Sequence, residues 1–219
     1  MNLGKALTQV PEAMLQIFPD ALFWGVGFIA FITFSYSFGV FFVSLIEAIL
    51  IYHVLNYANE NLQIVSPNIG TKGECRTGFS DISLRAISLF EREFKPVFLS
   101  SSIFMISVIS SYIMGVLLYL KDELVILGSA YGEQYTTRIY GSTIFFAVLL
   151  FVAMSYRLFM QCDSAFNIII SVFLGLATGA AITAQNNGLL GINSLNLLGV
   201  PIIRRRTATG SDLYVCSPT

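Results

Sequence analysis

The length of its uncharged apolar runs is the feature that most constrains how this chain can fold. Residues 21–46 contain no charged residue, and residues 97–120 and 139–160 form two further runs, the last interrupted by a single arginine. After Asp163 no charge appears for forty residues, until Arg204. A helix that crosses a membrane needs about 20 predominantly apolar residues. Each run is therefore long enough to span a bilayer.

The amino-acid composition also indicates that lipid surrounds much of the chain. Apolar residues make up 55% of the 219 residues and charged residues only 11%, whereas about 25% of the residues in a soluble domain are charged. The formal net charge of −1 offers no general attraction for the phosphates of a nucleic acid. We therefore expect an integral membrane protein whose main partner is the lipid bilayer, and we expect no nucleic-acid partner.

We predict an all-α fold: a four-helix transmembrane bundle with an interfacial loop helix and an extended C-terminal tail. The first 20 residues are not expected to be a cleavable signal peptide, because acidic residues and prolines occur where its apolar core should be. The predicted segments are an N-terminal amphipathic segment (1–20), the first span (21–52), a polar loop with a surface helix (53–95), spans two to four (96–184), and an interfacial segment with the C-terminal tail (185–219).

The end of the last span is the least regular part of this plan. Forty uncharged residues are too many for one span, and they contain the sequence QNNGLLGINS. Asparagine is costly in hydrocarbon unless it is hydrogen-bonded, and glycine is a poor helix former. We therefore predict a helix over about residues 165–184, after which residues 185–203 leave the helix. A fifth span within this region remains an open alternative.

The distribution of basic residues does not orient the predicted bundle. Six Lys and Arg residues fall on each side of a four-span arrangement, so the positive-inside rule gives no decision. The cluster Arg204, Arg205 and Arg206 follows an apolar run closely and favours both termini on the cytoplasmic side. These three arginines are also expected to anchor the chain at the membrane interface.

Two ionisable residues adjoin the predicted spans. Glu47 follows the first run and Arg157 lies near the end of the third. In a four-span bundle both positions fall on the same side, where the two side chains can pair with each other or extend to water. An ion or proton path that uses them is the alternative, because a charge within a span is a functional candidate.

Small residues recur every four positions in two of the predicted spans. Residues four apart share one face of a helix, and small side chains there allow two helix backbones to approach closely. We predict helix association through these stripes, within the bundle or between copies in a homo-oligomer. The stripes consist of Ser107, Ser111 and Gly115 in the second span and Ser171, Gly175, Gly179 and Thr183 in the fourth.

No set of catalytic or metal-ligating residues is evident in the sequence. His53 is the only histidine. The sequence contains neither a His-x-x-x-His nor a Cys-x-x-Cys motif, the spacings typical of metal sites. We predict no catalytic residue, no metal and no cofactor. Cys75 and Cys162 fall on the same predicted side, so a disulfide between them is an open alternative, whereas Cys216 falls on the other side.

Three features of the sequence resemble the multi-pass inner-membrane and minor capsid proteins of large double-stranded DNA (giant) viruses. They are the Phe- and Ile-rich spans, the loop NIGTKGECRTGF and the tail LNLLGVPIIRRRTATGSDLYVC. The resemblance implies a non-enzymatic virion protein that lies in an internal membrane, and in a host endomembrane during assembly. It also implies capsid or other membrane proteins as partners.

The tail suggests how such a partner is contacted. Leu213, Tyr214 and Val215 form an apolar run in a polar stretch, and an extended segment of this kind can add a strand to a neighbouring protein. The alternative function is a small ion channel or transporter, which needs a polar path through the bundle. A membrane enzyme that modifies lipids is the least favoured class.

Overall fold

The computed structural model describes residues 3–62, 89, 98–131, 134–200, 202–206 and 212–216. Helices make up almost all of this part of the chain. They are α1 (Leu3–Thr33), α2 (Tyr36–Leu62), α3 (Ser101–Tyr119), α4 (Lys121–Tyr131), α5 (Gln134–Phe159), α6 (Ala165–Leu190) and the short 3-10 helix η3 (Ile192–Leu195), and the strands β1 (Ile202–Arg206) and β2 (Asp212–Cys216) follow them.

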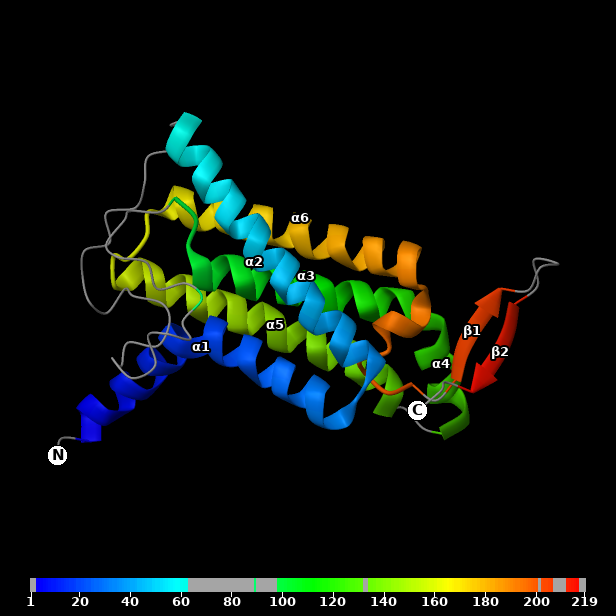
Figure 1. The fold of residues 1–219 in the computed structure, drawn as a ribbon. Coiled ribbons are helices and arrows are strands. Elements are labelled where there is room, and N and C mark those ends of the chain that lie inside the picture. The colour runs from blue at the N-terminus through cyan, green and yellow to red at the C-terminus, as the bar shows by residue number, and fades with distance from the viewer. Residues whose placement is uncertain are drawn as a thin grey trace.

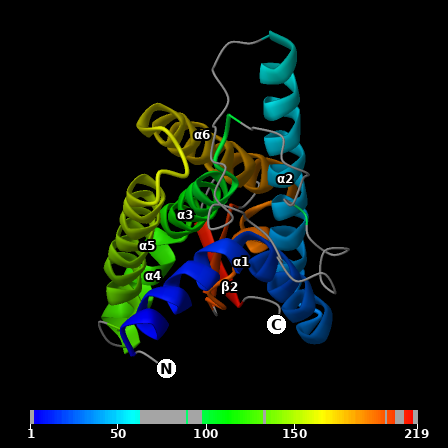
Figure 2. The ribbon, with the colours of Figure 1, turned by 90° about the vertical axis from the view of Figure 1, so that its left-hand side faces the viewer.

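The predicted α-helical membrane fold is confirmed. Four helices are long and apolar enough to cross a bilayer: α2, α3, the part of α5 from Ile139 to Phe159, and α6. α3 lies among the other helices (Figures 1 and 2), and 72% of the residues in its most apolar stretch are buried, against 6% for α5. α3 is therefore the core of the bundle, and α5 presents its apolar side chains outward.

The first span does not lie where the sequence predicted it. Residues 21–46 are not one helix, because α1 ends at Thr33 and α2 begins at Tyr36. The Oγ1 of Thr33 donates to the carbonyl oxygen of Ile29, and it accepts a hydrogen bond from the backbone N–H of Ser35. Phe34 has φ of +48°, in the left-handed region. The chain thus reverses within an apolar run, a change of direction that hydropathy does not detect.

The N-terminal segment is also different from the prediction. Residues 1–20 do not form a separate amphipathic segment in the described part, because α1 continues from Leu3 to Thr33 without a break. The reversal after α1 places the N-terminus and the C-terminus at opposite ends of the bundle (Figure 1). The side of the membrane on which each terminus lies stays a prediction.

The last apolar helix extends six residues beyond its predicted end. α6 continues through the QNNG sequence to Leu190 and stops at Gly191, whose φ is +78°. η3 follows at once, so no fifth span forms in residues 185–200. The prediction that the chain leaves the helix at residue 185 was wrong because the buried polar group of Asn186 finds partners, as shown below.

The C-terminal tail folds back on itself instead of remaining a single extended segment. β1 and β2 pair antiparallel, with Ile203 opposite Val215, Arg204 opposite Tyr214 and Arg205 opposite Leu213. This two-stranded hairpin lies beyond the helices, at the end of the bundle opposite to the first residues of α1 (Figure 1).

The predicted surface helix of the 53–95 loop lies mostly outside the described residues. α2 occupies the first part of that segment, up to Leu62. Leu89 is described, and its backbone N–H donates to Oδ1 of Asp20, a fully buried residue of α1, at 2.9 Å. The loop is therefore tied to α1 at this point.

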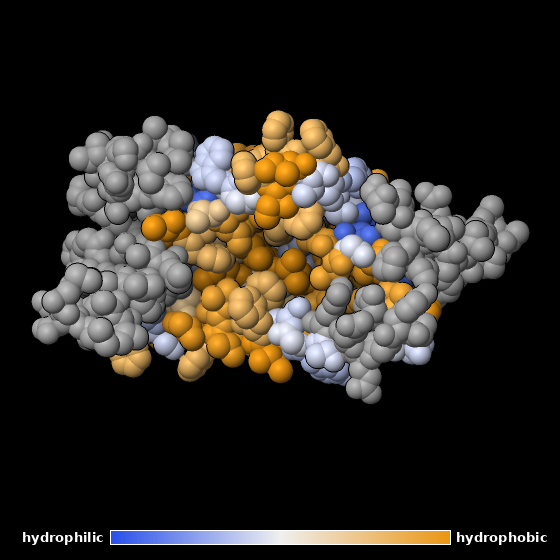
Figure 3. Space-filling view, turned by 90° about the horizontal axis from the view of Figure 1, so that it is seen from below, coloured by the Kyte–Doolittle hydropathy of each residue, from blue (hydrophilic) through white to orange (hydrophobic). Residues whose placement is uncertain are grey.

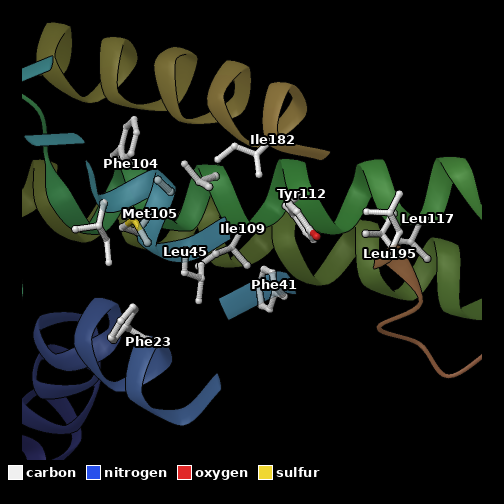
Figure 4. Close-up of a cluster of buried hydrophobic side chains, with 14 of the residues drawn as sticks. Phe23, Phe41, Leu45, Phe104, Met105, Ile109, Tyr112, Leu117, Ile182 and Leu195 are labelled. Carbon is white, nitrogen blue, oxygen red and sulfur yellow. The ribbon is translucent and has the colours of Figure 1, made fainter. Parts of the chain in front are cut away.

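An apolar core and an apolar surface complete the fold. Figure 4 shows core side chains from α1, α2, α3 and α6 and from the η3 region converging around α3, with Tyr112 among them. Apolar residues also cover the middle of the surface shown in Figure 3, between the two ends of the molecule. A chain that is apolar both inside and outside is suited to lipid as its solvent.

Candidate functional site

The two predicted stripes of small residues meet each other. A Cβ atom added to Gly175 would lie 2.6 Å from the carbonyl oxygen of Phe104 and 2.6 Å from Cβ of Ser107. One added to Gly179 would collide with the carbonyl oxygen of Val108 and lie 2.9 Å from Cβ of Ser111. We call this contact the α3–α6 seam; it comprises Ser107, Ser111, Gly115, Ser171, Gly175, Gly179 and Thr183.

Hydrogen bonds to backbone groups reinforce the seam. The hydroxyl of Ser111 donates to the carbonyl oxygen of Leu176 at 2.7 Å. The hydroxyl of Ser171 accepts from the backbone N–H of Ser100 at 2.9 Å. Because both bonds join α6 to α3 or to the residue just before α3, the stripes are used within one copy of the chain. They give no separate evidence for a homo-oligomer.

A buried polar cluster lies beside the seam. Nδ2 of Asn186 donates to Oγ of Ser44 at 2.8 Å and to the hydroxyl oxygen of Tyr112 at 3.1 Å. These residues come from α6, α2 and α3, and all three are buried. The hydroxyl of Ser194 in η3 donates to the carbonyl oxygen of Asn186 at 3.3 Å. The cluster therefore joins three helices and η3 by polar contacts inside an apolar bundle.

The sequence prediction did not anticipate this cluster. Asn186 was expected to leave the helix because an unpaired amide is costly in hydrocarbon. The structure satisfies the amide with two hydroxyl groups, so the helix continues past it. Ser44 is the signal that was available, since a serine inside a long apolar run is a candidate for bonding between helices.

Glu47 lies in a different environment from the one predicted. It is the twelfth of the 27 residues of α2, so it lies well inside a span and not at its edge. Its Oε2 accepts a hydrogen bond from Nε2 of Gln185 at 3.4 Å. Glu47 and Gln185 extend the polar cluster along α2 and α6.

Arg157 does not pair with Glu47. It forms an ion pair with Asp163, and the side chains of the two residues are only 11% and 4% exposed. The pair spans the turn between α5 and α6, where the backbone N–H of Cys162 also donates to the carbonyl oxygen of Arg157. The predicted Glu47–Arg157 pair is thus wrong, because the chain reversal after Thr33 moves Glu47 away from the end of its helix.

Cys162 forms a disulfide. Cys75 lies outside the described residues. The strand that carries Cys216 lies at the far end of the bundle from the α5–α6 turn (Figure 1). The Cys75–Cys162 disulfide therefore stays a prediction.

The remaining predicted residues lie near the ends of the fold. His53 belongs to α2 and contacts the ring of Tyr52 edge-on, with the ring centres 5.3 Å apart. Arg204, Arg205 and Arg206 belong to β1, opposite Tyr214, Leu213 and Asp212 of β2. The predicted contact segment at residues 213–215 is therefore hydrogen-bonded to its own chain along one edge.

Comparison of the chain with protein-family models, curated proteins and solved structures finds no match.

Proposed function

We propose that this chain is a non-enzymatic structural membrane protein, a virion component that links an internal membrane to a capsid shell. The observation that carries the structural role is the α3–α6 seam. It brings two helix backbones into close contact along the middle of the bundle. Such packing supports a rigid scaffold in lipid and leaves little room there for a substrate or a solvated path.

The two ends of the bundle support a linking role. At one end of the bundle α1 and α2 extend past the other helices, and at the other end lies the β1–β2 hairpin (Figure 1). A two-stranded hairpin is only marginally stable on its own, and its free edges can accept a further strand. We therefore assign the contact with capsid or other membrane proteins to the hairpin. The virion assignment itself rests on the resemblance of the spans, the loop and the tail.

Co-purification tests this proposal. The membrane or particle that contains the chain is isolated, and its other proteins are identified by mass spectrometry. Deleting residues 207–219 removes β2 and should release the partner while the chain stays in the membrane. Replacing Leu213 and Val215 with serine is the matched substitution, since it leaves β1 and the helices unchanged. Retention of every associated protein by both variants would refute the assignment.

The polar cluster favours a second candidate, a small ion channel or transporter. Ser44 and Asn186 place polar atoms inside the bundle, and Glu47 and Gln185 continue this polar line on its exposed side. Polar groups of this kind line ion paths. Flux measured in sealed vesicles separates the two functions. The structural proposal expects no flux above that of empty vesicles. A selective flux that Glu47→Gln reduces would favour the channel.

A further inference from the structure

We propose that α1 crosses the bilayer as a fifth segment, so that the N-terminal residues and the β1–β2 hairpin lie on opposite sides of the membrane. Its apolar part, Ile17–Thr33, has 17 residues and is just shorter than the helices recognised as spans. The proposal does not depend on the function proposed above, because it concerns only how the chain sits in lipid.

The length of α1 matches that of the central helix. At about 1.5 Å per residue, the 19 residues of α3 extend about 28 Å, close to the roughly 30 Å of bilayer hydrocarbon. The 17 apolar residues of α1 extend about 25 Å by the same measure. The small difference falls within what tilt and local thinning of the bilayer accommodate.

Contacts at the start of α1 and directly after its reversal indicate that α1 covers the same depth as α3. Phe18, near the start of the apolar part, packs on the cluster that contains Ile103 and Ile106 in the first turns of α3. At the other end, Ser37 follows the reversal directly and donates to the carbonyl oxygen of Asn193 in η3, beyond the end of α6. The hairpin of α1 and α2 therefore reaches from one end of the bundle core to the other.

The chemistry of the reversal identifies lipid as its surroundings. No charged residue occurs between Asp20 and Glu47, and the exposed side chains around the turn include Phe31, Phe34 and Tyr36. Phe34, at the tip, is 84% exposed. Tyrosine, the residue type of Tyr36, is enriched at the boundary between hydrocarbon and headgroups, whereas the exposed Phe31 and Phe34 side chains would be unfavourable in water. We therefore assign the tip to this boundary.

The single tryptophan makes the depth of α1 measurable in the unmodified chain. Trp24 lies halfway along the apolar part and is partly exposed. The protein is reconstituted in phosphatidylcholine vesicles whose acyl chains carry bromine either near the headgroup or near the chain end. We expect bromine near the chain end to quench Trp24 most. Stronger quenching by bromine near the headgroup would mean that α1 lies on the surface and would overturn the proposal.

A matched variant locates the tip. In the Trp24→Phe, Phe34→Trp double variant, one aromatic residue replaces another at both positions, and the only tryptophan lies at the turn. We expect bromine near the headgroup to quench it most. Quenching as deep as that of Trp24 in the unmodified chain would mean that the tip stops inside the hydrocarbon, and the crossing would be refuted.

The sides of the two termini provide an independent measurement. A short epitope tag is added to each end, and sealed membranes from expressing cells are treated with protease from outside. We expect only one of the two tags to be removed. Removal or protection of both tags together would place the termini on the same side and would overturn the proposal.

Discussion

At the scale of single residues, small side chains and one asparagine determine how the helices meet. The spacing of Gly175 and Gly179 with their serine neighbours was sufficient to predict a packing face, because residues four apart necessarily share a side of a helix. Spacing did not reveal that the two faces meet each other within one copy. It also did not reveal the partners of Asn186, which come from α2 and α3.

Gly179→Ala should destabilise the protein by about 1–3 kcal/mol, the usual cost of overfilling a close contact. The added methyl group meets the carbonyl oxygen of Val108, which belongs to the backbone and cannot rotate away. Gly188→Ala, in the same helix, is the control, because nothing lies within 4 Å of its added Cβ. The free energy of unfolding, measured by titration with a denaturing detergent, compares them. Equal effects of the two substitutions would argue against the seam.

Asn186→Leu should cost about 1 kcal/mol, because hydrogen bonds between helices in membranes are of this order. The substitution removes the bonds to Ser44 and Tyr112 and leaves both hydroxyl groups in an apolar core. Asn187→Leu is the matched control at the neighbouring position, which is less buried. The same unfolding titration measures both variants. A smaller loss for Asn186→Leu than for Asn187→Leu would contradict the role of the cluster.

At the scale of elements, reversals and turns decide the topology. The turn at Phe34 and Ser35 divides one apolar run into two helices, and the turn between α5 and α6 is held by the Arg157–Asp163 ion pair. The sequence contained a cue to the first turn, since Thr33 and Ser35 are polar residues that can bond to nearby backbone groups. Hydropathy averages over such residues, and it therefore favoured a single span.

Removing only one charge of the Arg157–Asp163 pair should lower the free energy of unfolding strongly. Arg157→Met or Asp163→Asn alone leaves one charge without its partner, and for a buried pair this costs about 3–5 kcal/mol. The double variant removes both charges and should be clearly more stable than the sum of the two single losses predicts. A double-mutant cycle on the free energy of unfolding tests this. Simple additivity would show that the two residues do not interact.

At the scale of the whole molecule, the bundle is closed on itself around α3. Its seam and its polar cluster lie within one chain, while α5 presents apolar side chains outward. Lipid can cover such a face without any further protein. A stable monomer in the membrane is therefore the expected state before a partner binds.

The midpoint of unfolding in detergent micelles should accordingly be independent of protein concentration. An obligate homo-oligomer shows a midpoint that rises with concentration, because its association is part of its stability. The measurement compares samples at low and high ratios of protein to detergent, because this ratio sets the effective protein concentration within the micelles. A rising midpoint would show that copies of the chain complete the fold.

Lipid as the surrounding solvent, the helical class and the packing faces of the helices could all be predicted from the order of residues alone. Each of these depends on local properties: the number of consecutive apolar residues, the scarcity of charge and the spacing of small residues. These properties act along a single helix and do not require knowledge of its neighbours.

The reversal of the first apolar run, the length of α6 and the pairing of polar groups became evident from the folded arrangement of the helices. Glu47 lies beside Gln185, Arg157 pairs with Asp163, and Asn186 bonds to Ser44 across 142 positions of sequence. A polar group in an apolar bundle is acceptable only where a partner is within reach. That condition depends on distances between helices, and the order of residues along one chain does not contain them.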